Sequence, residues 1–159
     1  MSTSSPQIDP RGPRFTASVT AVILAVVLVT GPSAPAVVLL AVQTVFFAVG
    51  AFAGVQHTPT AFLFRTLIRP RLPAPSHLED AAPPRFAQAV GLVFATVALV
   101  GYTSGATLLG AIATGFALGA ALLNAVFGFC LGCEMYLLLR RIAPKNTTTH
   151  TATNKEVVA

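Results

Sequence analysis

Charged residues are scarce in this chain of 159 residues. Lys and Arg account for 10 positions and Asp and Glu for 5, so that charged residues make up 9% of the sequence. A soluble globular domain carries about 25%. The scarcity is also concentrated, because residues 15–64 and residues 86–133 contain no Asp, Glu, Lys or Arg. The low charge excludes an ordinary soluble domain, and the short length leaves no room for a separate soluble enzyme domain.

Several patterns that carry chemistry are also missing. The sequence contains no Ser-His-Asp arrangement, no phosphate-binding Gly-rich loop and no basic surface of the kind that binds nucleic acid. The sequence pI of about 10.0 comes from Lys and Arg residues that we expect to orient the chain in a membrane. We therefore expect no nucleic-acid partner, and we do not expect a stand-alone enzyme.

Apolar residues fill the two uncharged blocks. One bilayer crossing takes about 20 apolar residues, so each block is long enough for two helices. Gly and Pro residues interrupt the first block at residues 31–35, and Gly101 and Gly105 flank the break in the second. The sequence predicts an all-α polytopic membrane protein in contact with the lipid bilayer, with spans at about residues 15–30, 36–55, 86–100 and 106–127. The membrane domain is expected at residues 14–142, between disordered tails at residues 1–13 and 143–159.

The basic residues predict an orientation. Every Lys and Arg lies before the first span, between the second and third spans, or after the fourth. Because cytoplasmic loops are enriched in Lys and Arg, we predict a multi-pass protein of the cytoplasmic membrane with both termini cytoplasmic.

A short motif recurs before the first and third spans. Four residues of the first copy have identical counterparts at one constant spacing in the second: Asp9, Arg14, Phe15 and Val19 match Asp80, Arg85, Phe86 and Val90. The recurrence predicts two tandem hairpins related by a pseudo-twofold axis along the membrane normal, which is a parallel repeat. It counts against the alternative that the first span is a cleaved signal peptide.

A basic segment and a Pro-rich linker join the hairpins across residues 57–85. Arg65 and Arg69 lie four residues apart among aromatic and aliphatic side chains, and Arg71 follows them. This pattern is typical of a short helix at the membrane interface whose guanidinium groups bind lipid phosphates. A soluble anion, such as an oxidised sulfur species, is the alternative ligand.

Two amide side chains lie within the predicted spans. Gln43 in the second span and Asn124 in the fourth need interior partners, since water is absent from the bilayer core. We expect them to pair with each other across a contact between the second and fourth helices. The alternative is that they line a path for a polar substrate.

The two cysteines of the chain, Cys130 and Cys133, form one C-x-x-C motif just beyond the end of the fourth span. Such thiols can form a disulfide, carry sulfur or share a metal ion. The helix either continues through the motif or breaks at Gly128 and Gly132, and a break would place the cysteines at the start of a new helix, whose dipole favours a thiolate. Three interpretations remain open: a redox or sulfur-carrying pair, a zinc site completed by residues such as His57, and simple apolar packing. No cofactor is predicted: zinc and a quinone stay open as alternatives, but no motif in the sequence supports either.

Two stretches resemble a known family. Residues 80–88, which lead into the third span, and the Phe-Gly-Phe-Cys-x-Gly-Cys signature within residues 123–133 are similar to the bacterial integral membrane proteins grouped as domain of unknown function 4395. The resemblance covers about residues 8–142. It implies a bacterial inner-membrane location and, because family members are often encoded near them, a rhodanese-like sulfurtransferase or thioredoxin-like protein as partner. The family has no established activity.

These observations favour a membrane protein that presents Cys130 and Cys133 to the cytoplasm for thiol-redox chemistry or sulfur transfer, with Cys130 as the attacking thiol and Cys133 as the resolving one. Two alternatives remain open: a small transporter or channel subunit for an inorganic sulfur species, and a membrane anchor for a soluble sulfurtransferase or thioredoxin-like protein. A homo-oligomer is compatible with each.

Overall fold

Two helical hairpins make up most of the chain. The computed structural model describes residues 6–142. The first hairpin consists of α1 (Arg11–Thr30) and α2 (Ala34–Phe52), and the second of α4 (Ala82–Thr103) and α5 (Thr107–Phe127). All four helices are long and apolar enough to cross a membrane. The prediction of a mostly helical chain with four long apolar helices is confirmed.

The first and third spans begin earlier than predicted. Pro83 and Pro84, which the sequence assigned to the linker, lie in the first turn of α4, and Pro13 lies in the first turn of α1. Proline is tolerated there because the first amides of a helix have no intrahelical acceptor. The carboxylates of Asp9 and Asp80 accept hydrogen bonds from the backbone amides of Arg11 at 3.0 Å and Ala82 at 2.8 Å.

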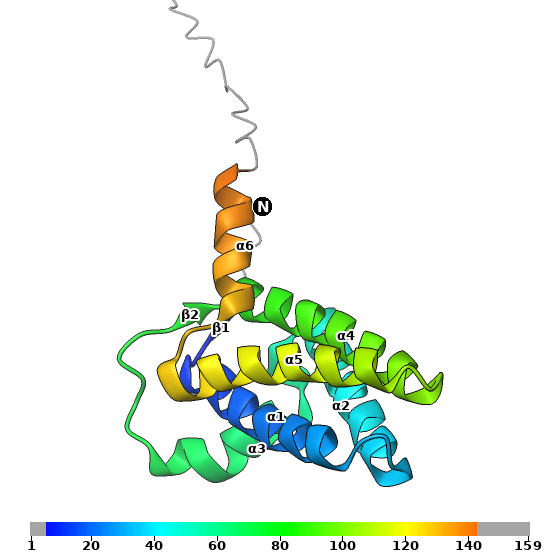
Figure 1. Ribbon diagram of the computed structural model, residues 1–159. Coiled ribbons are helices and arrows are strands. Elements are labelled where there is room, and N and C mark those ends of the chain that lie inside the picture. The colour runs from blue at the N-terminus through cyan, green and yellow to red at the C-terminus, as the bar shows by residue number, and fades with distance from the viewer. Residues whose placement is uncertain (1–5, 143–159) are drawn as a thin grey trace, which may run out of the picture.

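The hairpins pack crosswise. α1 lies against α5 and α2 lies against α4, while α4 and α5 also pack together within their hairpin (Figure 1). The first helix of each hairpin therefore contacts the second helix of the other. The predicted pairing of the second span with the fourth is wrong as a main contact, because among the described residues α2 packs chiefly on α4 and α5 packs chiefly on α1 and α4.

The interior is filled by small and aliphatic side chains. Leu24, Val27 and Leu40 are fully buried, and Ala95 and Ala98 pack with them. Large apolar side chains such as Val29 and Phe116 are exposed on the outer faces. This distribution suits a bundle whose outer surface contacts lipid, because lipid tails are as apolar as the core.

A small antiparallel sheet joins the starts of the two hairpins. Strand β1 (Gln7–Ile8) pairs with β2 (Glu79–Asp80), with Ile8 opposite Glu79. The disordered tail expected at residues 1–13 is corrected in part, since residues 7–8 form β1 and residues 11–13 begin α1, whereas residues 1–5 lie outside the described residues. The tail expected at residues 143–159 lies outside the described residues.

Shorter helices leave the same end of the bundle. After η1 (Val55–His57), the chain forms α3 (Pro59–Leu63), η2 (Phe64–Ile68) and η3 (Arg69–Arg71), so the predicted basic segment is helical. Helix α6 (Leu131–Ile142) follows α5. Figure 1 shows α6 standing nearly at right angles to the four long helices, on the opposite side of the bundle from α3.

Candidate functional site

A sharp turn separates α5 from α6 and carries the cysteine pair. Gly128 adopts a left-handed conformation with φ of 69° directly after α5. Its amide donates to Asn124 O at 3.0 Å, and the amide of Phe129 donates to Leu123 O at 3.3 Å, which closes the last turn of the helix. Of the two continuations left open by the sequence, the structure has the break.

Cys130 and Cys133 form a disulfide across the first turn of α6, with their Cα atoms 5.2 Å apart. Both residues are half-buried. The backbone amide of Cys133 also donates to Cys130 Sγ at 3.3 Å, so the sulfur of Cys130 occupies the position of a helix N-cap acceptor. When the pair is reduced, this amide and the helix dipole favour a thiolate on Cys130.

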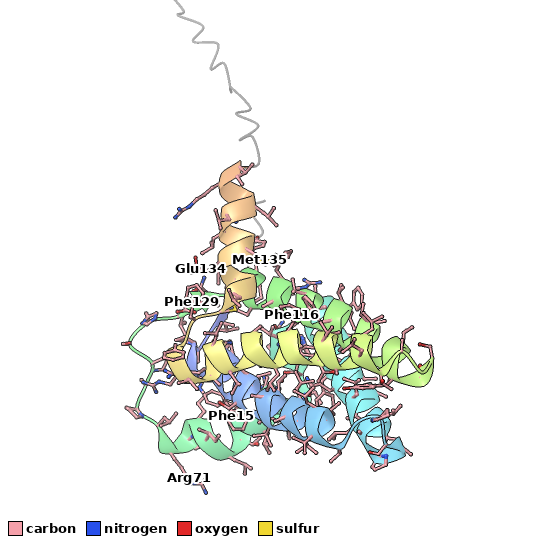
Figure 2. All side chains as sticks on the ribbon, in the orientation of Figure 1. Phe15, Arg71, Phe116, Phe129, Glu134 and Met135 are labelled. Carbon is pink, nitrogen blue, oxygen red and sulfur yellow. A yellow bond between two sulfur atoms is a disulfide. The ribbon has the colours of Figure 1, made fainter. Side chains whose placement is uncertain are left out.

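Close packing fixes α6 against α4. A Cβ atom on Gly132 would lie 2.6 Å from Ala87 Cα, so only glycine allows the two backbones to approach this closely. One turn further along α6, the rings of Tyr136 and Phe86 lie 5.8 Å apart. Figure 2 shows Glu134 and Met135 at this base of α6, with Phe129 on the preceding turn; Glu134 is exposed. The disulfide is therefore held on a rigid helix start.

Arg14 of α1 fixes the other side of the turn. Its guanidinium group donates to the carbonyl oxygens of Ala125 at 3.1 Å and Val126 at 2.8 Å, in the last turn of α5. These carbonyls lack intrahelical partners, and a cation is favourable at a helix C-terminus. The sequence suggested only a topological role for Arg14. Its recurrence as Arg85 in the repeated motif was the signal for a structural role.

Arg85 of α4 makes the corresponding contact with the first hairpin. It donates to the carbonyl oxygens of Ala51 at 2.7 Å and Phe52 at 2.9 Å, at the end of α2. Each arginine therefore binds the C-terminus of the helix that crosses from the other hairpin.

A cavity of about 290 Å³ lies beside the disulfide. It is bounded by α1, α4, α5 and the start of α6, with Phe47 of α2 also in its lining, and Cys130 forms part of its wall. Its lining is mostly apolar, and none of the described residues that line it is charged. The cysteine pair thus has an apolar side toward the bundle, while Glu134 lies on the exposed side.

The two amides of the spans do not pair with each other as predicted. Gln43 is 2% exposed and donates from Nε2 to Thr20 Oγ1 at 3.3 Å, within the first hairpin. Asn124 lines the cavity near the end of α5. At about 1.5 Å per helical residue, Gln43 lies about 9 Å further from this end of the bundle. This difference in depth, together with the crosswise packing, separates them.

The basic segment borders a different cavity, of about 270 Å³. Arg65 and Arg69 line it together with Asp9 and Phe64. Arg71, at the lower edge of Figure 2, is exposed and donates to the carbonyl of Leu67. The segment does not meet the cysteines, because it lies on the other side of the bundle (Figure 1).

His57 follows α2, where its Nδ1 lies 2.9 Å from Ala53 O. Within residues 6–142, His57 joins no cluster of three or more His, Cys, Asp or Glu side chains that could hold a metal ion. The residues that the structure describes therefore lend no support to the zinc alternative.

The fold and site define a class of protein: a helical protein with four candidate membrane spans and a cysteine pair at the start of α6, the short helix that follows the fourth span. The chain belongs to the family described as domain of unknown function (DUF4395), whose model matches residues 8–141. The expected resemblance is confirmed. Neither the curated proteins nor the solved structures that were compared gave a match.

Proposed function

We propose that this protein is a membrane-embedded thiol–disulfide exchange protein whose reactive pair is Cys130 and Cys133. The observation that carries the proposal is the position of the disulfide at the first turn of α6, with Cys130 Sγ accepting the amide of Cys133 at 3.3 Å. A purely structural disulfide between residues so close in sequence would close only a very small loop and so would add little stability. The capping position of Cys130 Sγ therefore favours a role in thiol–disulfide exchange over a purely structural role.

The exchange step needs only the two thiols and a partner disulfide. In the reduced protein, the Cys130 thiolate attacks one sulfur of the partner disulfide and releases the other as a thiolate, which leaves a mixed disulfide. The Cys133 thiolate then attacks Cys130 Sγ. The internal disulfide forms, and the partner leaves as a dithiol that has gained two electrons and two protons. The same steps in reverse reduce the internal disulfide.

Glutathione provides a defined test of these roles. The full-length protein in detergent is incubated in a graded series of reduced and oxidised glutathione, and free thiols are counted by alkylation and mass spectrometry. We expect the wild-type protein to form the internal disulfide reversibly. Cys133→Ser should accumulate a glutathione adduct on Cys130, whereas Cys130→Ser should react more slowly because Cys133 lacks the N-cap position.

Two outcomes contradict the proposal. A wild-type protein that never forms the disulfide in the series would exclude exchange chemistry. Equal adduct formation in the two single variants would exclude the assigned roles. The Leu137→Ser variant is a matched control, because it introduces the same residue on an exposed position of α6 and should leave the titration unchanged.

The cysteine end of the bundle is proposed to face the cytoplasm. In the described part of the chain, the charged side chains lie on the segments that meet at this end or on α6, whereas the hairpin tips near residues 31–33 and 104–106 carry none. The positive-inside rule supports a cytoplasmic location for this end of the bundle. After reduction, a membrane-impermeant maleimide should label the cysteines only in permeabilised cells; labelling of intact cells would reverse the orientation. A soluble thioredoxin-like or rhodanese-like protein would be the exchange partner.

We also propose that the two hairpins are copies of one unit related by a pseudo-twofold axis along the bundle. Arg14 and Arg85 make matching contacts with opposite hairpins. Ile8 and Glu79, which occupy corresponding positions before the repeated motif, face each other in the small sheet. Such self-pairing is expected where a twofold axis passes between the strands.

The short helices support the same relation. Phe15 of α1 packs on Phe64 with ring centroids 5.9 Å apart, as Phe86 of α4 packs on Tyr136 at 5.8 Å. The segment that contains α3 would therefore correspond to α6. Their departure from opposite sides of the bundle agrees with this correspondence (Figure 1).

A further inference from the structure

The cavity beside Cys130 is elongated along α5. Its α5 wall extends from Phe116 through Ala117, Ala120 and Ala121 to Asn124, a stretch of about 12 Å at helical rise. Phe94 of α4 lies opposite, with its ring 6.1 Å from that of Phe116. The lining therefore changes from aromatic and apolar, where Phe116 reaches the outer face of the bundle, to polar and sulfur-containing at the end that carries the disulfide.

Two unpaired amides lie at the polar end. Gln88 of α4 and Asn124 of α5 both line the cavity. Within residues 6–142, neither side chain makes a hydrogen bond to the protein. Both side chains are half-buried, and each amide NH₂ can donate to a carbonyl oxygen. The cavity is thus prepared for an apolar ligand that carries hydrogen-bond acceptors at one end.

We propose that this cavity binds a lipid-soluble quinone that accepts electrons from the Cys130–Cys133 dithiol. The inference rests on the proposed exchange function and names the second substrate of the same site. The quinone ring lies at the amide end, where Gln88 and Asn124 donate to its carbonyl oxygens, and the apolar tail follows the α5 wall toward Phe116. A volume of about 290 Å³ accommodates a head group and leaves a long tail in the bilayer; ligand pockets begin at about 300 Å³.

The overall step balances in atoms and electrons. The two thiols lose two electrons and two protons as the bond between Cys130 Sγ and Cys133 Sγ forms. The quinone gains both electrons and two protons and leaves as the quinol. Cys130, whose residue borders the cavity, is the sulfur that faces the quinone, and Cys133 supplies the second sulfur. An exchange partner then reduces the disulfide and restores the dithiol.

The chemistry of the lining favours a quinone over a phospholipid. A phosphate head group calls for a cation, and none of the described residues lining this cavity is charged. The second cavity shares Gln88 with this one but differs from it in that Arg65 and Arg69 border it. A ligand with neutral acceptors and an apolar body fits the cavity beside Cys130, and it can enter from the bilayer because the surrounding helices are membrane spans by length and composition.

The test uses the full-length protein in detergent under anaerobic conditions. The pair is reduced with dithiothreitol, the reductant is removed, and a short-tail ubiquinone is added. Quinol formation is followed by ultraviolet absorbance, and the disulfide by alkylation and mass spectrometry. We expect quinol to form in a one-to-one ratio with the disulfide. No quinol, or quinol formed equally by Cys130→Ser, would overturn the proposal.

Cavity variants separate this inference from the exchange function. Ala120→Phe places a phenyl ring in the cavity. Because the ring takes the space of the quinone, the variant should slow quinone reduction at least about tenfold. Asn124→Leu should raise the quinone concentration for half-maximal rate about two- to tenfold, as expected for one hydrogen bond. Leu122→Phe, on an exposed face of α5, is the matched control and should behave as wild type.

Exchange with oxidised glutathione is measured on the same samples. If Ala120→Phe retains exchange and loses quinone reduction, the variant is folded and the quinone site is supported. If the wild-type protein exchanges with glutathione but never reduces quinone, the quinone inference fails and the exchange function stands. If Ala120→Phe and Leu122→Phe reduce quinone at the wild-type rate, the cavity is not the site and the inference fails.

Discussion

The helices that follow α2 and α5 begin with equivalent capping hydrogen bonds. In each, a backbone amide donates to the side chain three residues before it, but the acceptor atom differs. Thr58 Oγ1 accepts the amide of Ala61 at 3.2 Å at the start of α3. Cys130 Sγ accepts the amide of Cys133 at 3.3 Å at the start of α6. A hydroxyl group can only cap the helix, whereas a thiol can also exchange electrons. The cysteine pair therefore occupies capping positions of α6 that correspond to those of Thr58 and Ala61 in α3.

The next contact in each turn differs in the same way. Thr60 of α3 receives a hydrogen bond from Thr16 Oγ1 of α1 at 3.0 Å. Gly132 of α6 instead lies directly against Ala87 of α4. Helix α3 therefore contacts α1 through a hydrogen bond between side chains, whereas α6 contacts α4 through a close approach of the two backbones. The closer approach places α6 and its disulfide beside the apolar cavity.

Transferring the cysteines to the first half tests the comparison most severely. In a Cys130→Ser, Cys133→Ser background, Thr58→Cys with Ala61→Cys should form a disulfide nearly completely under mild oxidation, because the capping geometry matches. Mass spectrometry after alkylation measures the yield. Thr58→Cys with Phe62→Cys, one residue further along α3, is the control and should cross-link less. An equal yield of disulfide from both pairs would contradict the conclusion that the turns before α3 and α6 have matching geometry.

Removal of the crosswise arginines should have the next largest effect. Arg14→Ala and Arg85→Ala each leave two helix-end carbonyls without their charged donor, and we expect each to lower the free energy of unfolding by about 1–3 kcal/mol. Detergent denaturation titrations measure this loss. Only Arg14→Ala should also change the glutathione titration of the cysteine pair, since Arg14 holds the turn that carries it.

Lysine variants refine the arginine comparison. Arg14→Lys keeps the charge but cannot donate to two carbonyls from one planar group, so it should restore only part of the lost stability. A glutathione titration that shifts equally in Arg14→Ala and Arg85→Ala would show that the effect is global and that Arg14 does not act through the cysteine turn.

Enlarging Gly132 should separate α6 from α4. Gly132→Ala introduces a Cβ atom 2.6 Å from Ala87 Cα, and overpacking of this kind costs about 1–3 kcal/mol. Because helices can shift to relieve the clash, we expect the lower part of this range. Denaturation titrations measure the stability. Thr60→Ala, at the comparable place in α3, should cost less; a larger cost there would reverse the comparison.

The two aromatic pairs should give the smallest difference. Double-mutant cycles of Phe15 with Phe64 and of Phe86 with Tyr136, each residue changed to Leu, should give similar coupling energies of about 0.5–1.5 kcal/mol. The ring distances of 5.9 and 5.8 Å motivate this expectation. Coupling in one pair and none in the other would mean that the short helices are held by different contacts.

Much of the architecture could be predicted from local sequence. The four long helices follow from apolar length, and the breaks follow from Gly and Pro at the hairpin tips. Gly128 and Gly132 indicated a break before the cysteines as one of two alternatives. The choice depended on tertiary contacts, because the turn is stabilised by Arg14 from another helix and by close packing of Gly132 on Ala87.

Partners across helices could not be predicted in this way. Gln43 needed a hydrogen bond, but several polar side chains could supply it, and Thr20 does. The choice depends on which helices are neighbours and on the depth of each residue along its helix. The same applies to the cavity, whose walls come from five separate segments.

Local sequence is sufficient to establish that the chain has four apolar helices, that its charges gather beside the helix ends away from the hairpin tips, and that its only two cysteines share one motif. The apolar length of a segment and the positions of its charges are local properties, so they can be identified without knowledge of the fold. The crossing of the hairpins, the turn of α6 away from the bundle, and the mostly apolar cavity that Cys130 borders together with two unpaired amides follow from the three-dimensional packing. These features depend on close packing between residues far apart in the chain, which the order of residues along one helix does not specify.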